Sequence, residues 1–203
     1  MPSIHTKIEN LIKAYGKGKL LFPSDFSDIS NAENIKKVLL RLEQKEVLVR
    51  LARGIYLFPK QDKEFGTLYP SVEEIAKAIA KRDKARIVPT GIHALNKLGL
   101  STQVPMKVVY LTDGAPRSIQ IGKRSIKFKK TTPKNLMAKG EISSLVIQAL
   151  REIGQDNVTK EQLARIHELL QKEEPSNVKY DANLAPAWIA RIMREANGNK
   201  RKL

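Results

Sequence analysis

The amino-acid sequence predicts an α+β protein built from two domains. A chain of 203 residues is long enough for two small domains, and helical and strand periodicities alternate along it. Residues 59–70 interrupt both periodicities with proline, glycine and charged side chains, which is typical of a linker. We therefore expect a first domain at residues 1–64 and a second, mixed domain with a small β-sheet and a helical C-terminal layer at residues 70–203.

The first domain should begin with three helical segments. Apolar residues recur at helical spacing from Ile4 to Tyr15, and Ser3 is positioned to cap that helix. Residues 23–26 read as a single helical turn. A stronger amphipathic helix is expected at residues 31–45, with Ser30 or Asn31 as its cap.

Two short strand-like runs follow this helix. Residues 47–51 and 55–58 are rich in β-branched, aliphatic and aromatic side chains, and Gly54 between them suits the positive φ of a tight turn. The order helix, short helix, helix and hairpin is typical of a winged helix-turn-helix. The alternative is a hairpin that only covers the hydrophobic core.

The outward face of the helix at residues 31–45 should be polar and mostly cationic. Such a helix fits the major groove of DNA, where arginine, lysine and amide side chains recognise base edges. The candidate base-reading residues are Asn34, Lys37, Arg41 and Gln44. Leu40 also points partly outward, which requires a second domain or a dimer partner to cover it.

Further cations in the first domain should contact DNA phosphates, because such contacts give affinity without reading sequence. These candidates are Lys17, Lys19, Lys36, Arg50, Arg53 and Lys60. A structural role as solvated side chains is the alternative for each.

The second domain should open with a helix at residues 71–82, because Ser71 and Glu74 have capping-box spacing. A short helix at residues 90–98, a strand at 108–111 and a hairpin formed by 118–121 and 125–128 are expected next. From Glu141 onward the pattern is helical. The cations of the last five residues are expected to be solvated.

A second basic patch lies on that hairpin and the segment after it. Its members are Arg117, Lys123, Arg124, Lys127, Lys129 and Lys130. An electrostatic arm on flanking DNA, a surface for an acidic protein partner, and lysines that protect an edge strand all remain open.

Net charge points to a polyanionic partner. The chain carries a formal charge of +16, of which residues 66–140 hold +11. Cysteine is absent, which excludes disulfides and thiolate metal sites, and no stretch approaches the roughly 18 apolar residues of a membrane span. We expect a soluble, cytoplasmic protein, either monomeric or homodimeric.

Catalytic and metal-binding patterns are weak. The three histidines lack metal-ligand spacing, and Asp113 lacks the acidic residue and lysine that a nuclease would need on the next strand. We therefore expect no enzyme activity, no metal and no cofactor.

Several motifs resemble one known family. The run 48–56 (LVRLARGIY) is similar to the wing of AbiEi-type antitoxins of type IV toxin–antitoxin systems, and residues 89–101 and 108–114 resemble the start of their second domain. The resemblance covers roughly residues 5–135. It implies a transcriptional repressor of its own operon that binds inverted repeats in its promoter, and an antitoxin against a nucleotidyltransferase-like toxin encoded beside it. An RNA-binding or ribosome-associated adaptor without catalytic activity is the alternative.

Overall fold

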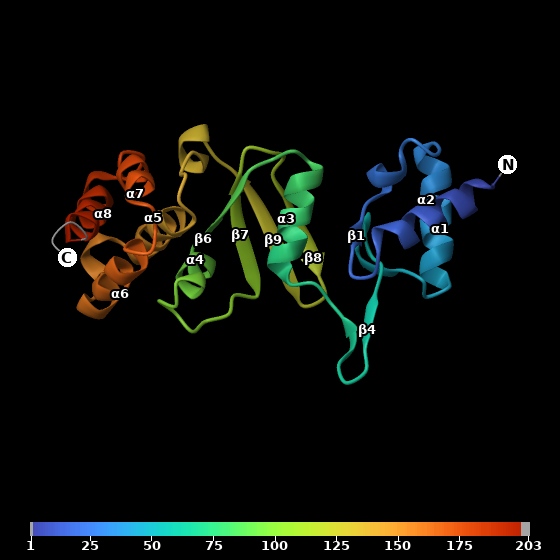
Figure 1. Cartoon of the computed structure of the whole chain (residues 1–203), viewed down its shortest axis with the longest axis horizontal. Helices are drawn as coiled ribbons and strands as arrows, with labels where there is room; N and C mark the ends of the chain where they lie inside the picture. The colour runs from blue at the N-terminus through green and yellow to red at the C-terminus, as the bar shows by residue number, and fades with distance from the viewer. Residues whose placement is uncertain (1, 200–203) are drawn as a thin grey trace. The chain divides into compact units, whose positions relative to one another are not determined.

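The computed structural model describes residues 2–199, which form helices and small sheets of an α+β protein (Figure 1). Two compact units are present: residues 1–78 with 120–122, and residues 79–119 with 123 onward. The boundary between them falls inside a helix. The basic residues 200–202 lie outside the described residues.

The first unit starts with two helices that cross at a steep angle (Figure 1). A three-stranded antiparallel sheet, in the order β1-β3-β2, packs beside them. The elements are α1 (Ile4–Tyr15), β1 (Leu20–Leu21), the 3-10 helix η1 (Pro23–Phe26), α2 (Ala32–Gln44), β2 (Val49–Ala52) and β3 (Ile55–Leu57).

Side-chain caps fix where both helices begin. The Ser3 hydroxyl accepts a hydrogen bond from the Thr6 backbone N–H at 3.2 Å, and Asn31 Oδ1 accepts one from the Asn34 N–H at 3.0 Å. Each cap satisfies a backbone donor that the first turn of a helix leaves free. The apolar faces of α1 and α2 then form one core with strand residues, including Ile12, Phe26 and Leu39, which are at most 1% exposed.

A polar hairpin occupies the stretch expected to be a linker. Strands β4 (Lys60–Asp62) and β5 (Gly66–Leu68) pair antiparallel, and Gln61 Nε2 donates to Thr67 Oγ1 across them at 3.0 Å. At its tip, Asp62 Oδ1 accepts the backbone N–H groups of Glu64 and Phe65. These bonds stabilise a turn without any buried apolar face, so hydrophobic periodicity gave no sign of it.

The second unit is built around a mixed four-stranded sheet in the order β6-β7-β9-β8. Strand β6 pairs antiparallel with β7, whereas β7 and β9 are parallel, with Tyr110 opposite Phe128. The elements of this part of the chain are α3 (Val72–Arg82), β6 (Ile87–Thr90), α4 (Ile92–Lys97), β7 (Lys107–Thr112), β8 (Arg117–Ile121) and β9 (Arg124–Lys130).

The expected start of the helix at residue 90 is wrong, because residues 87–90 form β6 and the helix begins at Ile92. Gly91 separates the two elements with a φ of 63°. The capping box that opens α3 is confirmed: Glu74 Oε2 accepts the Ser71 N–H at 2.7 Å, and Ser71 Oγ accepts the Glu74 N–H at 3.1 Å.

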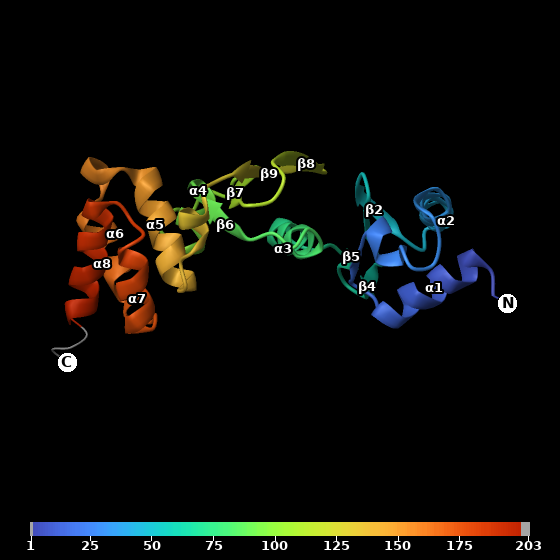
Figure 2. The same ribbon diagram turned by 90° about the horizontal axis from the view of Figure 1, so that it is seen from above.

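The two faces of this sheet differ. Alternate residues such as Tyr110, Ile126 and Phe128 are buried on one face, and α3 lies along the sheet in Figure 2. The opposite face carries the exposed side chains of Lys127 and Lys129, which stand across from half-buried residues of β7. One sheet therefore presents a hydrophobic face and a cationic face.

Helices form the last layer of the second unit. They share a core that includes the fully buried side chains of Val146, Leu150, Ile166 and Ile189. No helix within residues 2–199 is long and apolar enough to cross a lipid bilayer. The segments are η2 (Pro133–Leu136), α5 (Glu141–Ile153), η3 (Gln155–Asn157), α6 (Lys160–Leu170), α7 (Pro175–Ala182) and α8 (Ala187–Asn199).

Candidate nucleic-acid interface

The exposed face of α2 gathers four of the predicted contact residues. Lys37, Arg41 and Gln44 are spaced four and three residues apart, so they form one stripe along the helix, and all three are exposed. Lys36 is exposed on the adjoining stripe. The opposite side of the helix is buried in the core of the first unit, so this polar face is directed to solvent.

Asn34 lies at the N-terminal end of the same helix and is half-buried. Its Nδ2 donates a hydrogen bond to Ser30 Oγ at 3.3 Å. One of its two amide N–H groups is therefore already engaged within the chain. The other N–H can still donate, and the side-chain oxygen can still accept a hydrogen bond.

An acidic neighbour engages one cation of the stripe. Lys37 Nζ lies 2.7 Å from Glu33 Oε1, one helical turn earlier, and both side chains are more than half exposed. Within the described residues, Lys36 and Arg41 have no ion-pair partner. Both charges are therefore uncompensated, and Arg41 is the one that lies in the middle of the stripe.

Leu40 interrupts the polar face. Its side chain is 46% exposed between Lys36, Lys37 and Arg41 on the helix surface. The sequence indicated this misfit, and within the described residues of the first unit the side chain stays largely uncovered. A large apolar side chain at this place adds an exposed hydrophobic contact point to an otherwise charged surface.

The β2–β3 hairpin places Arg53 at its tip. Gly54 adopts a φ of 72° in the turn, where a residue without Cβ is favoured, and a bulge at Leu51 breaks the regular pairing of the strands. A Cβ on Gly54 would lie 3.9 Å from Pro23, so the turn sits against the start of η1. Arg53 is consequently exposed on a short, well-anchored turn.

Lys17 and Lys19 lie at the other end of β3. The Gly18 N–H donates to the Phe58 carbonyl at 2.6 Å, and the Phe58 N–H donates to the Lys19 carbonyl at 2.9 Å. These bonds hold the loop beside the residues that lead into β4, where exposed Lys60 begins the strand. The predicted phosphate contacts therefore fall into two groups, with Arg53 at one end of β3 and the three lysines at the other.

Arg50 occupies the middle of the hairpin. It stands opposite Tyr56 in the pairing of β2 and β3, and its side chain is exposed. Burial raises the pKa of Tyr56, while the nearby positive charge of Arg50 acts in the opposite direction. The Tyr56 hydroxyl therefore stays protonated at neutral pH.

The residues of the predicted basic patch in the second unit do not all lie together. Lys127 and Lys129 share the open face of the sheet, Lys123 and Arg124 are exposed at the β8–β9 turn, and Lys130 is exposed at the end of β9. Arg117 is separate from them. It lies over the Phe128 ring at 5.4 Å on the covered face and forms an ion pair with Asp83, so it has a structural role there.

The candidate catalytic residues have structural partners. Asp113 accepts hydrogen bonds from the Arg86 backbone N–H and Nε, each at 2.8 Å, and these bonds hold the pKa of its carboxyl below the usual range. His93 stacks edge-on against Tyr110 at 5.6 Å. Among residues 2–199, no group of three or more histidine, aspartate or glutamate side chains is arranged to hold a metal ion.

Comparison with known proteins gives a family and a distant structural likeness. The model of a family of unknown function, DUF6088, matches residues 7–178. No curated protein matches the chain significantly. Among solved structures, the chain is similar to the RV2827C protein from Mycobacterium tuberculosis, with 12% sequence identity, a TM-score of 0.46, and coverage of 96% of this chain and 82% of that one. The family match spans most of the chain, which therefore belongs to the DUF6088 family of unknown function.

Proposed function

We propose that the first unit is a winged helix-turn-helix that binds duplex DNA in a sequence-specific manner. In this proposal α2 enters the major groove and the β2–β3 hairpin is the wing. The protein acts without catalysis as a cytoplasmic transcriptional regulator, and it represses its own operon as the antitoxin of a type IV toxin–antitoxin system.

The observation that carries the proposal is the exposed stripe of Lys37, Arg41 and Gln44 on a helix whose other face is buried. A rigid helix of this kind can present several side chains to base edges at once. Arginine pairs well with guanine and glutamine with adenine in the major groove, and Leu40 offers an apolar contact for a thymine methyl group.

The two groups of cations around β3 support the same geometry. Arg53 at the wing tip and the lysine loop at the other end of the strand could each neutralise phosphates, with the recognition helix as the part that reads bases. Backbone hydrogen bonds and the hairpin turn fix both groups. The backbone that carries these cations is therefore ordered before binding, and the entropy lost on DNA is that of the exposed side chains.

The antitoxin part of the proposal depends on the resemblance of residues 48–56, 89–101 and 108–114 to AbiEi-type antitoxins. In the structure these segments form the β2–β3 hairpin, the β6–α4 segment and β7 with its following turn. The inferred partner is a nucleotidyltransferase-like toxin encoded beside the gene. The inferred DNA target is an inverted repeat in the protein's own promoter.

The sheet of the second unit is a poor platform for single-stranded RNA because its aromatic side chains are buried. The cationic sheet face carries Lys127 and Lys129, but Tyr110 and Phe128 are buried on the opposite face. Sheets that bind single-stranded RNA stack bases on exposed aromatic rings. The exposed face here supplies charge without those rings.

Selection from a random pool of duplexes tests the DNA proposal without knowledge of the operator. The full chain should enrich one motif with twofold symmetry, and that motif should occur upstream of its own gene. The Arg41→Ala variant should lose enrichment at one position of each half-site. Recovery of no motif, with stronger retention of structured RNA than of duplex DNA, would replace this proposal by the adaptor alternative.

The antitoxin part requires a separate experiment. Expression of the neighbouring gene alone should arrest growth, and co-expression of this chain should restore it. Restoration should persist with Arg41→Ala, since neutralisation of a toxin need not use the DNA-reading face. Absence of toxicity from the neighbouring gene would remove the antitoxin assignment and leave the repressor assignment in place.

A further inference from the structure

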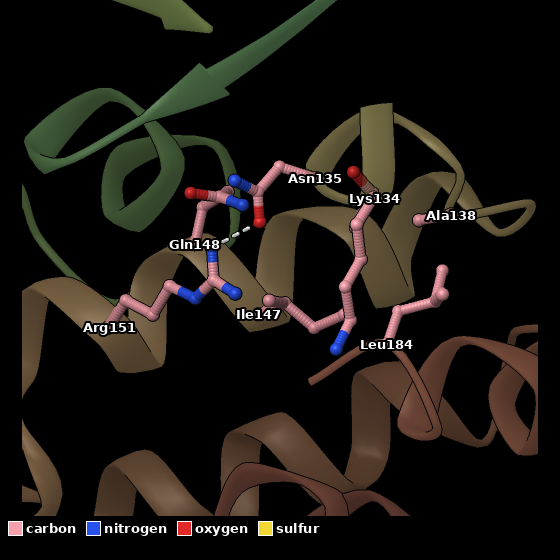
Figure 3. Close-up of a pocket in the computed structure, with 8 residues that line it drawn as sticks. Lys134, Asn135, Ala138, Ile147, Gln148, Arg151 and Leu184 are labelled. Carbon is pink, nitrogen blue, oxygen red and sulfur yellow. Dashed lines mark hydrogen bonds between the residues drawn. The ribbon is translucent and has the colours of Figure 1, made fainter. Parts of the chain in front are cut away.

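A small polar pocket lies between η2 and the middle of α5 in the second unit (Figure 3). Its enclosed space is only about 10 Å³, roughly the room for one water molecule, and the rest of the hollow is open to solvent. A bound group would therefore lie at the open mouth of the pocket, in contact with the side chains around it. The pocket is lined by Lys134, Asn135, Ala138, Ser144, Ile147, Gln148, Arg151 and Leu184.

Two cations face this pocket without an acidic partner. No aspartate or glutamate is among the lining residues, and no carboxylate in the described part of the chain forms an ion pair with Lys134 or Arg151. Desolvation by the surrounding protein lowers the pKa of Arg151. The guanidinium still carries its charge at neutral pH, so the pocket holds positive charge that the chain itself leaves uncompensated.

Neutral groups fix the orientation of the guanidinium. Arg151 Nη1 donates to Asn135 Oδ1 at 3.0 Å, and Asn135 Nδ2 donates to Thr131 Oγ1 at 2.8 Å. This chain of bonds engages one nitrogen of Arg151 and leaves its remaining N–H donors available. Figure 3 shows the guanidinium and the amides of Asn135 and Gln148 on one side of the pocket, with the Lys134 ammonium on the other.

Hydrogen-bond donors complete the lining. The side chain of Gln148 is only 4% exposed and lines the pocket. Ser144 adds a hydroxyl to the lining. An amide and a hydroxyl can each donate to an oxyanion, while arginine forms two parallel bonds to phosphate oxygens and lysine supplies a point charge. The lining thus matches a small, multiply charged oxyanion.

We propose that this pocket binds a phosphoryl group through Arg151, Lys134 and the amide of Gln148. The group is either free phosphate or the terminal phosphate of a nucleotide whose remainder extends into solvent, or it is a nucleic-acid phosphate. The site lies wholly within the second unit. It does not depend on α2 or on the proposed DNA contacts of the first unit.

Calorimetric titration of the full chain tests the site with defined probes: inorganic phosphate, a nucleoside monophosphate, the matching nucleoside without phosphate, and a short duplex. Phosphate and the monophosphate should bind with one-to-one stoichiometry, and the nucleoside should not bind. The Arg151→Gln variant should weaken binding about tenfold or more, because charge-assisted hydrogen bonds are lost. Gln148→Leu should weaken it without changing the net charge.

Arg194→Gln is the matched control. Like Arg151, Arg194 is exposed and donates to the side-chain oxygen of an asparagine, Asn183 Oδ1 at 3.0 Å, but it lies outside the pocket. It removes the same charge from the same unit and should leave phosphate affinity unchanged. Circular dichroism of each variant establishes that the helical layer is folded. Arg151→Lys keeps the charge but lacks the two-pronged geometry, so it should restore only part of the affinity.

The four probes distinguish a small phosphate ligand from a nucleic-acid phosphate. Loss of phosphate and monophosphate binding in Arg151→Gln supports a small-ligand site. Loss of duplex affinity alone supports a nucleic-acid phosphate. Equal affinities of Arg151→Gln and Arg194→Gln for every probe, with both variants folded, would overturn the proposal.

Discussion

The backbone N–H of Gly18 donates a 2.6 Å hydrogen bond to the carbonyl oxygen of Phe58, which ties the loop of Lys17 and Lys19 to the end of β3. In the other direction, the Phe58 N–H donates a hydrogen bond to the carbonyl oxygen of Lys19. The loop therefore continues the sheet of the first unit as an ordered extension. Its lysines are held in place relative to the hairpin that carries Arg53.

Replacement of Lys17 and of Arg41 should have different effects on DNA binding. Arg41→Ala should cost about 1–3 kcal/mol of binding free energy on the preferred duplex and relax selection at one base pair. Lys17→Ala should weaken all duplexes similarly and reduce the slope of log affinity against log salt by about one. Fluorescence anisotropy on preferred and random duplexes measures both. Identical behaviour of the two variants would contradict their assigned roles.

Removal of the Glu33 charge should strengthen DNA binding while it weakens the fold slightly. Glu33→Gln releases Lys37 from its 2.7 Å ion pair and removes a negative charge from α2, the proposed DNA-reading helix, which should raise DNA affinity by about twofold to fivefold. The unfolding free energy should fall by a few tenths of a kcal/mol, because an acidic group in the first turn favours the helix.

The control for this change is Glu168→Gln, which breaks the comparable 3.1 Å ion pair with Arg165 on α6. It should leave DNA affinity unchanged. If DNA affinity instead fell in the Glu33→Gln variant, Lys37 would not act on DNA from this face.

Leu40 should recognise a thymine methyl group. Wild-type protein should bind its selected site less tightly when one thymine is replaced by deoxyuridine, by about 1 kcal/mol for one lost methyl contact. The Leu40→Ala variant should not distinguish the two duplexes. Ile4→Ala, which trims another partly exposed apolar side chain on α1, should keep the wild-type preference. A wild-type protein indifferent to deoxyuridine at every position would contradict this role.

Asp113 should stabilise the fold in a pH-dependent way. Its carboxylate accepts two hydrogen bonds from Arg86, which lower its folded-state pKa, so the stabilisation is present above the unfolded-state value of about 3.9. It is lost as the pH falls through the folded-state pKa. Asp113→Asn should therefore unfold at lower urea than wild type at pH 7, and the difference should vanish in strong acid.

The matched control for Asp113 is Asp156→Asn, at an exposed carboxylate without a hydrogen-bond partner among residues 2–199. This change should leave the unfolding midpoint unaltered at neutral pH. A constant difference between Asp113→Asn and wild type across the whole pH range would show that the Arg86 contact is not the cause.

The sequence allowed accurate prediction where an apolar stripe or a local cap decides the structure. The caps at Ser3 and Ser71 operate over three residues, so spacing alone indicates them, whereas spacing left Ser30 and Asn31 both open as the cap that Asn31 provides. Strand β6 and the β4–β5 hairpin were missed. Residues 87–90 are all half-buried, so they show no alternation, and the hairpin has no buried apolar face.

The candidate site shows the same division. The exposed side of α2 follows from 3.6-residue periodicity, which placed Lys37, Arg41 and Gln44 together. Tertiary contacts decide the rest: Arg117 turns to Asp83, 34 residues away in sequence, and Arg151 meets Asn135 across 16 residues. No local pattern encodes such pairings, so the sequence grouped Arg117 with the solvent-facing lysines and gave no sign of the pocket.

Binding of the full chain to the DNA upstream of its own gene tests the central claim most directly. Anisotropy titrations across a salt series should compare that duplex with a scrambled duplex of equal length. The account predicts a preference of about a thousandfold or more for the upstream sequence, with most of it lost in Arg41→Ala. Equal and steeply salt-dependent affinity for both duplexes would contradict sequence-specific recognition by α2.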